Sequence, residues 1–307
     1  MNKKLIAVAV ASTLAAPAVY ADITPYGRIN NAIDITDLKG EDNVVDVSNV
    51  SSRFGFKGSG DIGNGMTAIG RYEFSTTTDK ELNNVNDLRL GYVGLSGGFG
   101  TITMGNQWSA YYNSVGTHLS PTYSIGYYLY SVVAQGPFRT SNTIKYANSF
   151  GPVSLELDIR VNDSEEDNDV AEKLNGNGGG IGLTFNATDD LAIALAFDNE
   201  ENNSLVDADT GAVTTVDDTE RTAIAGKWSF GGNYALILGY QKAEQGDDLE
   251  VEHTQLYFSA GLGEKTSLLV GFGTAEFDRT GIDNDAEPES IFLGVYHNMG
   301  GGLRLYL

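Results

Sequence analysis

Apolar and polar side chains alternate at every second residue along most of the chain. In residues 153–161, every odd-numbered side chain is apolar and every even-numbered one is polar or charged. The same alternation recurs at residues 54–56, 88–92, 181–185, 191–197, 224–228, 234–240, 256–258 and 268–272. A period of two puts alternate side chains on opposite faces of a strand. The pattern therefore predicts an all-β chain whose strands each have one apolar face.

The connections between these strands alternate between short and long. Short turns are expected at residues 61–65, 96–98, 148–152, 186–190, 230–233, 261–265 and 299–302. Long polar segments lie between them, at residues 39–49, 76–87, 162–178, 199–218, 243–248 and 278–290. Short periplasmic turns and long external loops are typical of up-and-down membrane barrels. The spacing thus favours an antiparallel up-and-down transmembrane β-barrel.

The second face of the strands is charged. It carries Arg28, Arg53, Lys57, Arg71, Glu73, Arg89, Lys145, Glu156, Asp158 and Arg160. A charged face fits either the solvated outside of a soluble sandwich or a water-filled lumen. Aromatic side chains near the strand ends of the apolar face are typical of membrane-interface girdles and favour the barrel.

The strand count bears on closure of the barrel. About 15 strands can be counted, the last at residues 303–307. Bacterial single-chain barrels usually have an even number of strands, and an open edge in lipid leaves backbone groups unpaired. We therefore expect 16 strands in the complete protein, with roughly 10 more residues in a closing strand. A truncated sequence and a naturally shorter product both remain open as explanations.

Residues 1–21 have the composition of a secretory signal peptide. Lys3 and Lys4 precede an almost unbroken apolar and small-residue run over residues 5–18, and small residues flank Tyr20. This order matches a basic region, an apolar region and a cleavage site. We expect the mature protein to begin at Asp22 and residues 22–307 to form one barrel domain. The chain has no cysteine, so no disulfide framework is expected.

The formal charge of the whole chain is −22. Removing the signal removes two lysines, which leaves 17 basic against 41 acidic residues, or −24. Such a charge argues against nucleic acid as a partner. The acidic segments 163–169 and 207–211 lack the spacing of a calcium loop, and the three histidines share no catalytic motif. We therefore expect no enzymatic activity, no catalytic residues, no cofactor and no metal.

Several segments resemble the Gram-negative general porins. They are residues 24–30 (TPYGRIN), 51–58 (SSRFGFKG), 61–66 (DIGNGM), 92–95 (YVGL) and 97–107 (GGFGTITMGNQ). The resemblance implies a 16-stranded barrel, usually a homotrimer, in the bacterial outer membrane and in contact with its lipid and lipopolysaccharide. It also implies passive diffusion of ions and small hydrophilic solutes, and a third external loop folded into the lumen as a constriction. The family commonly ends on a C-terminal Phe, whereas this sequence stops at Leu307.

The expected third loop, residues 108–138, is aromatic and uncharged. Its tyrosines are Tyr111, Tyr112, Tyr123, Tyr127, Tyr128 and Tyr130, and it contains no Asp, Glu, Lys or Arg. In related porins this loop usually supplies carboxylates, so the acidic half of the family's constriction cannot be transferred. Folding inward would bury apolar surface at about 25 cal/mol per Å². The tyrosines are either internal packing or a surface on which sugars slide.

The basic half of the constriction has candidates. Arg28, Arg53, Arg71 and Arg89 lie on the charged face of the first strands, and Arg139 follows the loop. The resemblance matches Arg53, Arg89 and Arg139 best to the family's basic wall. Clustered guanidinium groups raise the local concentration of anions. Alternatively, each arginine is paired with a carboxylate such as Glu73 or Glu156.

Three functions follow from this pattern. The first is a general diffusion porin for small hydrophilic solutes. The second is an oligosaccharide channel with a substrate preference. The third is a structural or adhesive outer-membrane barrel with a plugged lumen.

Overall fold

The computed structural model describes residues 22–36, 44–79, 88–120, 136–161, 177–201, 203–206, 213–280 and 287–307. The predicted signal peptide lies outside these residues. The chain divides into two compact units, Met1–Met104 and Gly105–Leu307. Within the described ranges, no helix has the length and apolar character needed to span a membrane.

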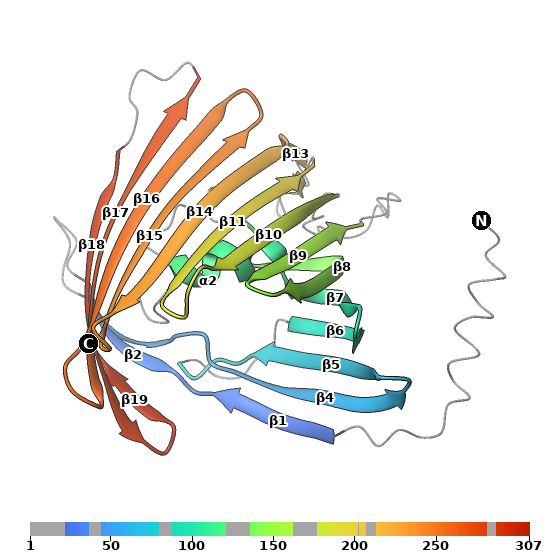
Figure 1. The fold of residues 1–307 in the computed structure, drawn as a ribbon. Helices are drawn as coiled ribbons and strands as arrows, with labels where there is room; N and C mark the ends of the chain where they lie inside the picture. Colours follow the sequence, from blue (N-terminus) through green and yellow to red (C-terminus); the bar gives the residue numbers. More distant parts are fainter. Residues whose placement is uncertain are drawn as a thin grey trace. The chain divides into compact units, whose positions relative to one another are not determined.

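Fifteen strands form the main sheet, and each pairs with its neighbours in sequence (Figure 1). In the first unit they are β1 (Asp22–Arg28), β4 (Arg53–Gly63), β5 (Met66–Ser75) and β6 (Leu88–Gly97), followed by β7 (Gly100–Trp108). The second unit contributes β8 (Arg139–Phe150), β9 (Val153–Arg160), β10 (Gly178–Asn186), β11 (Leu191–Glu200), β14 (Thr219–Phe230), β15 (Tyr234–Gln245), β16 (Leu249–Gly261), β17 (Thr266–Arg279), β18 (Glu289–Gly300) and β19 (Leu303–Tyr306). The predicted antiparallel up-and-down order and the count of about 15 strands are confirmed.

Two hairpins stand apart from the main sheet; only the second strand of the first hairpin falls in the predicted loop at residues 39–49, whereas the second hairpin lies within the predicted loop at residues 199–218. They are β2 (Asn31–Thr36) with β3 (Val44–Asn49), and β12 (Asn203–Val206) with β13 (Val213–Val216). The chain leaves the main sheet where β1 ends at Arg28, and β2 begins at Asn31. The buried Ser52 side chain binds the backbone of Asn30 at this break, accepting from its N–H at 2.9 Å and donating to its carbonyl at 3.2 Å. The backbone polar groups of Asn30 are thereby satisfied where the strand leaves the sheet.

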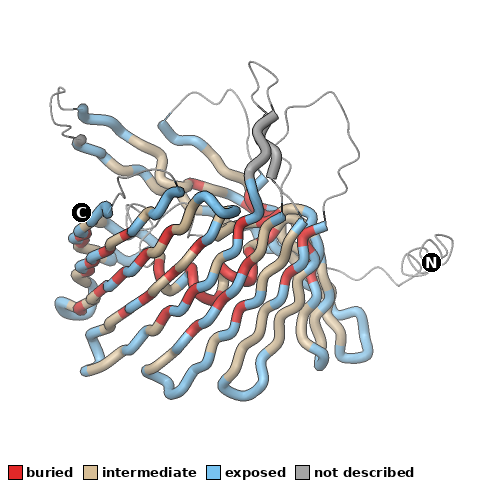
Figure 2. The backbone as a smooth tube through the Cα atoms, turned by 90° about the horizontal axis from the view of Figure 1, so that it is seen from above, coloured by how far each residue is buried: buried red, intermediate tan, exposed pale blue. Residues whose placement is uncertain are grey.

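Burial alternates along the strands of the main sheet as the period of two predicts (Figure 2). In β11, Leu195 is 48% exposed while its neighbours Ala194 and Ala196 are 0% and 8% exposed. The exposed side of the sheet carries large apolar side chains on nearly every strand. A continuous exposed apolar face of this kind fits contact with lipid.

A short helical segment lies on the other face of the second unit's sheet. It consists of η1 (Tyr112–Gly116) and α2 (Thr117–Leu119), and Figure 1 shows it beside β10 to β15. Its buried side chains Tyr111, Val115 and Leu119 join one apolar cluster with residues of β11 and β14–β18. This side of the sheet, called the inner face below, has alanines where the segment packs, at residues 194, 196, 223 and 225.

Candidate functional site

Three arginines of the first unit surround a single carboxylate. Arg89 Nε and Arg71 Nη2 each donate to Glu73, at 2.9 Å, and Arg53 Nε lies 3.9 Å from it. The hydroxyl of Tyr26 donates to Glu73 at 2.9 Å and accepts from Arg71 Nε at 2.6 Å. Glu73 is 1% exposed, whereas the side chains of Arg53, Arg71 and Arg89 are 20%, 32% and 10% exposed. We call this group the Glu73 cluster.

The sequence left open whether the arginines of the charged face are paired with carboxylates, and the Glu73 cluster shows this for three of them. Arg53, Arg71 and Arg89 are paired with a carboxylate, as the alternative interpretation held, and the partner is one of the two carboxylates it named. One negative charge cannot neutralise three positive ones, so the cluster keeps two net positive charges. Arg28 lies apart from Glu73 and donates to the backbone carbonyl of Ser51 at 3.1 Å.

Polar groups of the second unit hold the start of the helical segment against β9. The backbone N–H of Ala110 donates to Asp158 Oδ2 at 2.5 Å, and Asn113 donates to Glu156 Oε2 at 2.8 Å. Lys145 on β8 donates to the same Glu156 oxygen at 3.1 Å and to the carbonyl of Trp108 at 3.2 Å. The uncharged segment is thus tied to charged side chains of the wall behind it.

Two glycines let the segment approach the sheet closely. A Cβ at Gly182 of β10 would collide with Ser114 Oγ and would lie 2.6 Å from the carbonyl oxygen of Ala110. A Cβ at Gly239 of β15 would collide with the side chain of Leu119. The tyrosine-rich segment can therefore bury its apolar side only because these positions lack a side chain.

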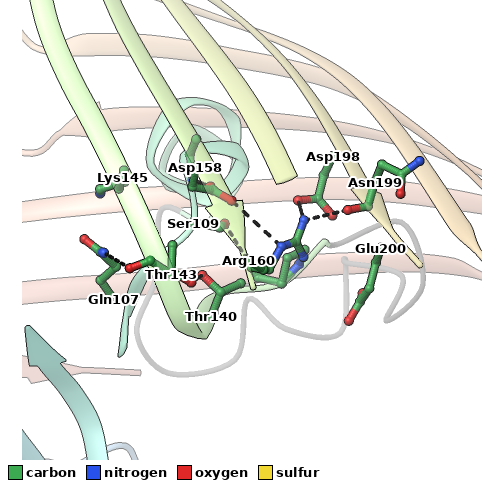
Figure 3. Close-up of polar contacts among 12 residues, drawn as sticks. Gln107, Ser109, Thr140, Thr143, Lys145, Asp158, Arg160, Asp198, Asn199 and Glu200 are labelled. Atoms are coloured by element: carbon green, nitrogen blue, oxygen red, sulfur yellow. Dashed lines mark hydrogen bonds and ion pairs between the residues drawn. The ribbon is translucent and has the colours of Figure 1, made fainter. Parts of the chain in front are cut away.

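Besides packing against the helical segment, the inner face carries a charged network centred on the buried Asp198 of β11 (Figure 3). Arg160 Nη2 donates to Asp198 Oδ2 and to the carbonyl of Asn199, and its Nε lies 3.8 Å from Asp158 Oδ1. Arg221 Nη1 donates to Asp198 Oδ1 at 3.1 Å and to Glu200 at 3.2 Å. Two arginines face three carboxylates here, which leaves one net negative charge. We call this group the Asp198 cluster.

A ladder of buried hydrogen bonds links the segment to the far strands of the inner face. Tyr257 donates to Gln255 at 3.1 Å, Gln255 donates to Gln241 at 3.2 Å, and Gln241 donates to the Tyr111 hydroxyl at 3.1 Å. All four side chains are almost completely buried. The ladder satisfies polar groups that would otherwise be costly within the apolar cluster.

The described aromatic residues of the loop differ in exposure, since Tyr111 is buried and Trp108, Tyr112 and Phe138 are partly exposed. Tyr111 is fully buried, and Tyr112 stacks on Trp108 and meets Phe138 edge-on, with ring centroids 4.7 and 4.8 Å apart. The guanidinium of Arg139 lies 5.2 Å from the centroid of the Trp108 ring. The positions of Tyr123, Tyr127, Tyr128 and Tyr130 lie outside the described residues. The complete burial of Tyr111 is what internal packing of the loop would require.

Burial shifts two titratable groups of the helical segment. Desolvation raises the pKa of the Tyr111 hydroxyl, so it stays protonated as a hydrogen-bonding group. Burial lowers the pKa of His118. The positive charge of Lys227 lowers this pKa further, whereas the contact with the Ser114 carbonyl raises it. Among the described residues, no group of three or more His, Asp or Glu side chains could hold a metal ion.

The acidic residues of the site were missed at the sequence level as functional candidates. Glu156 was noted as a charge on the second face and as a possible arginine partner, Asp158 only as a charge on that face, and Asp198 and Glu200 were not singled out. The alternation at residues 191–197 assigned the intervening positions to the inner face, and extending it by one residue reaches Asp198. No sequence signal indicated that Asp158 caps the loop backbone at Ala110, because that contact joins residues 48 positions apart.

Comparisons with known proteins agree with this architecture. The family model described as Gram-negative porin matches residues 7–307. Major outer membrane protein P.IB of Neisseria lactamica is 33% identical over 120 residues, which are 34% of this chain and 33% of that protein. Outer membrane porin PhoE of Enterobacter cloacae is 27% identical over 217 residues, which are 66% of this chain and 60% of that protein. The matched segment thus spans about a third of the length of P.IB.

Solved structures share the fold at low sequence identity. The anion-selective porin from Comamonas acidovorans superposes with a TM-score of 0.73 at 20% identity, covering 93% of this chain and 87% of that one. Salmonella typhi OmpF, in complex with daunomycin, gives a TM-score of 0.73 at 17% identity, covering 93% and 88%. The predicted porin-type barrel fold is confirmed by these likenesses, which at such identities concern the fold alone.

Proposed function

Because the chain belongs to the Gram-negative porin family, we propose that it forms a water-filled channel for passive diffusion of ions and small hydrophilic solutes across the outer membrane. The observation that carries the proposal is the two-sided sheet. One face is apolar and exposed on nearly every strand, while the other carries the Glu73 and Asp198 clusters. Such a sheet suits lipid on one side and water on the other.

Single-channel recording tests this proposal. Purified protein in planar lipid bilayers should give large, ohmic, weakly selective conductance steps. Block by micromolar sugar would instead favour the oligosaccharide channel. Properly folded protein that gives no conductance would overturn the channel proposal and favour a plugged structural barrel.

Two groups of residues are proposed to govern passage, and each is considered by itself: the Glu73 cluster of the first unit and the helical segment of the second. Two net positive charges support an anion-attracting wall formed by Arg53, Arg71 and Arg89, while Arg28 and Arg139 are held by a backbone carbonyl and an aromatic ring. In this proposal Arg53 and Arg89 set selectivity, and Arg139 positions the start of the loop. Of the two described loop tyrosines, Tyr111 is buried and Tyr112 is partly exposed. In this proposal Tyr112 is therefore the tyrosine that contacts passing solutes.

A homotrimer is the proposed assembly. A similar solved structure, OmpT of Vibrio cholerae, is described as a trimer form. In the first unit, an apolar hollow of about 650 Å³ supports such a contact. Its lining includes the exposed Phe56, Tyr72 and Val93 and glycines at residues 58, 60, 70 and 91. Light scattering of the detergent-solubilised protein should give three chains per particle. A monodisperse monomer would overturn this assignment.

We also propose that export removes residues 1–21. The basic start and the apolar run before Asp22 support a signal peptide. N-terminal sequencing of outer-membrane material should begin at Asp22, and a start at Met1 would overturn the assignment.

A further inference from the structure

A pocket of about 300 Å³ lies on the inner face of β14–β19, at the end of the sheet where the short turns are. Three cationic side chains line it: Lys227 of β14, Lys265 of the turn before β17, and Arg304 of β19. Short turns face the periplasm in barrels of this type. None of the residues that line the pocket belongs to the Asp198 cluster, and Ile237, Leu269 and Tyr296 connect it to the apolar cluster of the helical segment.

The strand register brings these cations together, Lys227 from β14 and Lys265 and Arg304 from the region of β17 to β19. Asn298 of β18 pairs with Arg304 of β19, and its backbone N–H donates to the carbonyl of Lys265 at 2.8 Å. Lys227 pairs with Ile237, which lines the same pocket. The cationic groups thus converge on one hollow although they come from strands far apart in the chain.

The charge of this pocket is not balanced by carboxylates. Lys227, Lys265 and Arg304 form no ion pair with any described carboxylate. In contrast, the arginines of the Glu73 and Asp198 clusters all lie within 4.0 Å of an acidic group. Glu264, next to Lys265 in the turn, is not a lining residue. Three unneutralised cations in a chain of net charge −22 indicate a site for an anion.

A buried hydroxyl points to the same conclusion. Tyr296 lines the pocket, and its hydroxyl is buried and has no hydrogen-bond partner among the described residues. A buried donor without an acceptor is destabilising, so a ligand that accepts its hydrogen bond is favoured. Ser267, which pairs with Tyr296 across β17 and β18, places a second hydroxyl on the pocket wall.

We propose that this pocket binds the phosphate group of a small phosphorylated solute during its passage through the channel. Attraction grows with ligand charge, so three cations favour a phosphate dianion over a monocarboxylate. Ile237 and Leu269 line the pocket beside the polar groups and offer an apolar surface to the carbon body of the solute. The volume is at the lower end of the roughly 300–1,000 Å³ of small-molecule sites. The role in transport rests on the proposed channel function, whereas the binding itself does not.

Phosphorus-31 NMR titration of the full chain in detergent tests the site with glucose 6-phosphate as the probe. The resonance should broaden and saturate with wild-type protein. The double variant K227Q/R304Q should weaken binding at least about tenfold, because two charge-assisted contacts are lost. Y296F should weaken it by a smaller factor, about threefold, because one neutral hydrogen bond is lost.

Matched controls separate a built site from general attraction. K242Q removes one positive charge from the same unit, where Lys242 is paired with Glu244 and Glu250, and should leave the affinity unchanged. The charge-retaining variant K227R/R304K should keep most of the binding, and heat-modified gel mobility verifies that each variant folds. Orthophosphate in place of the sugar phosphate reports how much of the affinity comes from the anion alone.

Three outcomes would overturn the proposal: no saturable binding to wild type, equal losses in K242Q and K227Q/R304Q, or competition by acetate as effective as that by orthophosphate. Conductance of the same preparations keeps this test distinct from that of the channel. A conducting protein that does not bind the probe refutes the site alone. A non-conducting protein that binds it refutes the channel and leaves the site intact.

Discussion

The Glu73 cluster and the Asp198 cluster solve the problem of charge on a strand face in opposite ways. In the first unit, one carboxylate with 1% exposure serves three arginines whose side chains stay partly accessible. In the second, Arg160 and Arg221, whose side chains are 3% and 11% exposed, are held by carboxylates that outnumber them, and the neighbouring Asp158 also binds the loop backbone.

The difference teaches that pairing and neutralisation are separate properties. Arginines of both clusters are hydrogen-bonded, so a contact map alone would treat them alike. The balance of charges tells them apart, because arginines outnumber the carboxylate in the first cluster and carboxylates outnumber arginines in the second. The Glu73 cluster suits an electrostatic role toward mobile ions, and the Asp198 cluster suits a structural role behind the helical segment.

The largest expected effect compares the central carboxylates. Asp198→Ala would leave Arg160 and Arg221 without their shared buried partner, which typically costs about 3–5 kcal/mol. Glu73→Ala should cost less, about 1–3 kcal/mol, because water reaches its arginines. The temperature at which the folded band disappears on gels measures both. Asp198→Asn keeps an acceptor and serves as the control; equal shifts for the two alanine variants would contradict the contrast.

A smaller loss of stability is expected from lifting the helical segment off the wall. Gly182→Ala would push its methyl group into Ser114 and the Ala110 carbonyl, and overpacking of this kind costs about 1–3 kcal/mol. We expect a lower unfolding temperature together with a changed single-channel conductance. Gly226→Ala is the matched control, because nothing lies within 4 Å of its added Cβ. Identical behaviour of the two variants would show that the segment does not depend on close approach.

Selectivity should respond to the Glu73 cluster without a comparable loss of stability. Replacing Arg53 and Arg89 together with Ala should move the reversal potential toward cations at every salt concentration, because the net positive charge is removed. Glu73→Gln should move it toward anions. An unchanged potential in both variants would refute the role of this wall.

In the unmodified protein, the salt dependence of ion selectivity also tests the role of the Glu73 cluster. External loop charges are screened within about 8 Å at physiological salt, whereas charges at the narrow zone act at short range. We expect a weak cation preference in dilute salt that fades or reverses toward anions as salt rises. Reversal potentials over a series of salt gradients measure this, and a cation preference that strengthens with salt would contradict it.

The smallest expected effect is a pH response confined to the second unit. Burial lowers the pKa of His118 in the docked segment, so the undocked segment takes up protons first as the pH falls. Docking is then fully stable above the ordinary histidine pKa of about 6.5 and weakens below it. Open-channel noise should rise as the pH falls toward about 5. His118→Gln should abolish this rise, and a rise that persists in the variant would assign it to another group.

Much of the fold was predictable because a β-strand reports its environment locally. The alternation at residues 153–161 corresponds to β9, and the short turns correspond to the connections of the main sheet. The hairpin of β2 and β3 was missed because the strand break depends on Ser52, a distant side chain that binds the backbone of Asn30. The polar composition of residues 39–49 is typical of a loop. The alternation of apolar and polar residues gave no other sign of a separate two-stranded sheet.

The strand order, the charged face and the residues available on it could be inferred from the sequence alone, because each of these follows from neighbours along the chain. Only the tertiary structure decided that Arg53, Arg71 and Arg89 share Glu73, that Gly182 and Gly239 admit the helical segment, and that Lys227, Lys265 and Arg304 converge on one pocket. These facts depend on register and on which positions of separate strands come to lie side by side. Register is set cooperatively by many backbone hydrogen bonds, and no single segment encodes it.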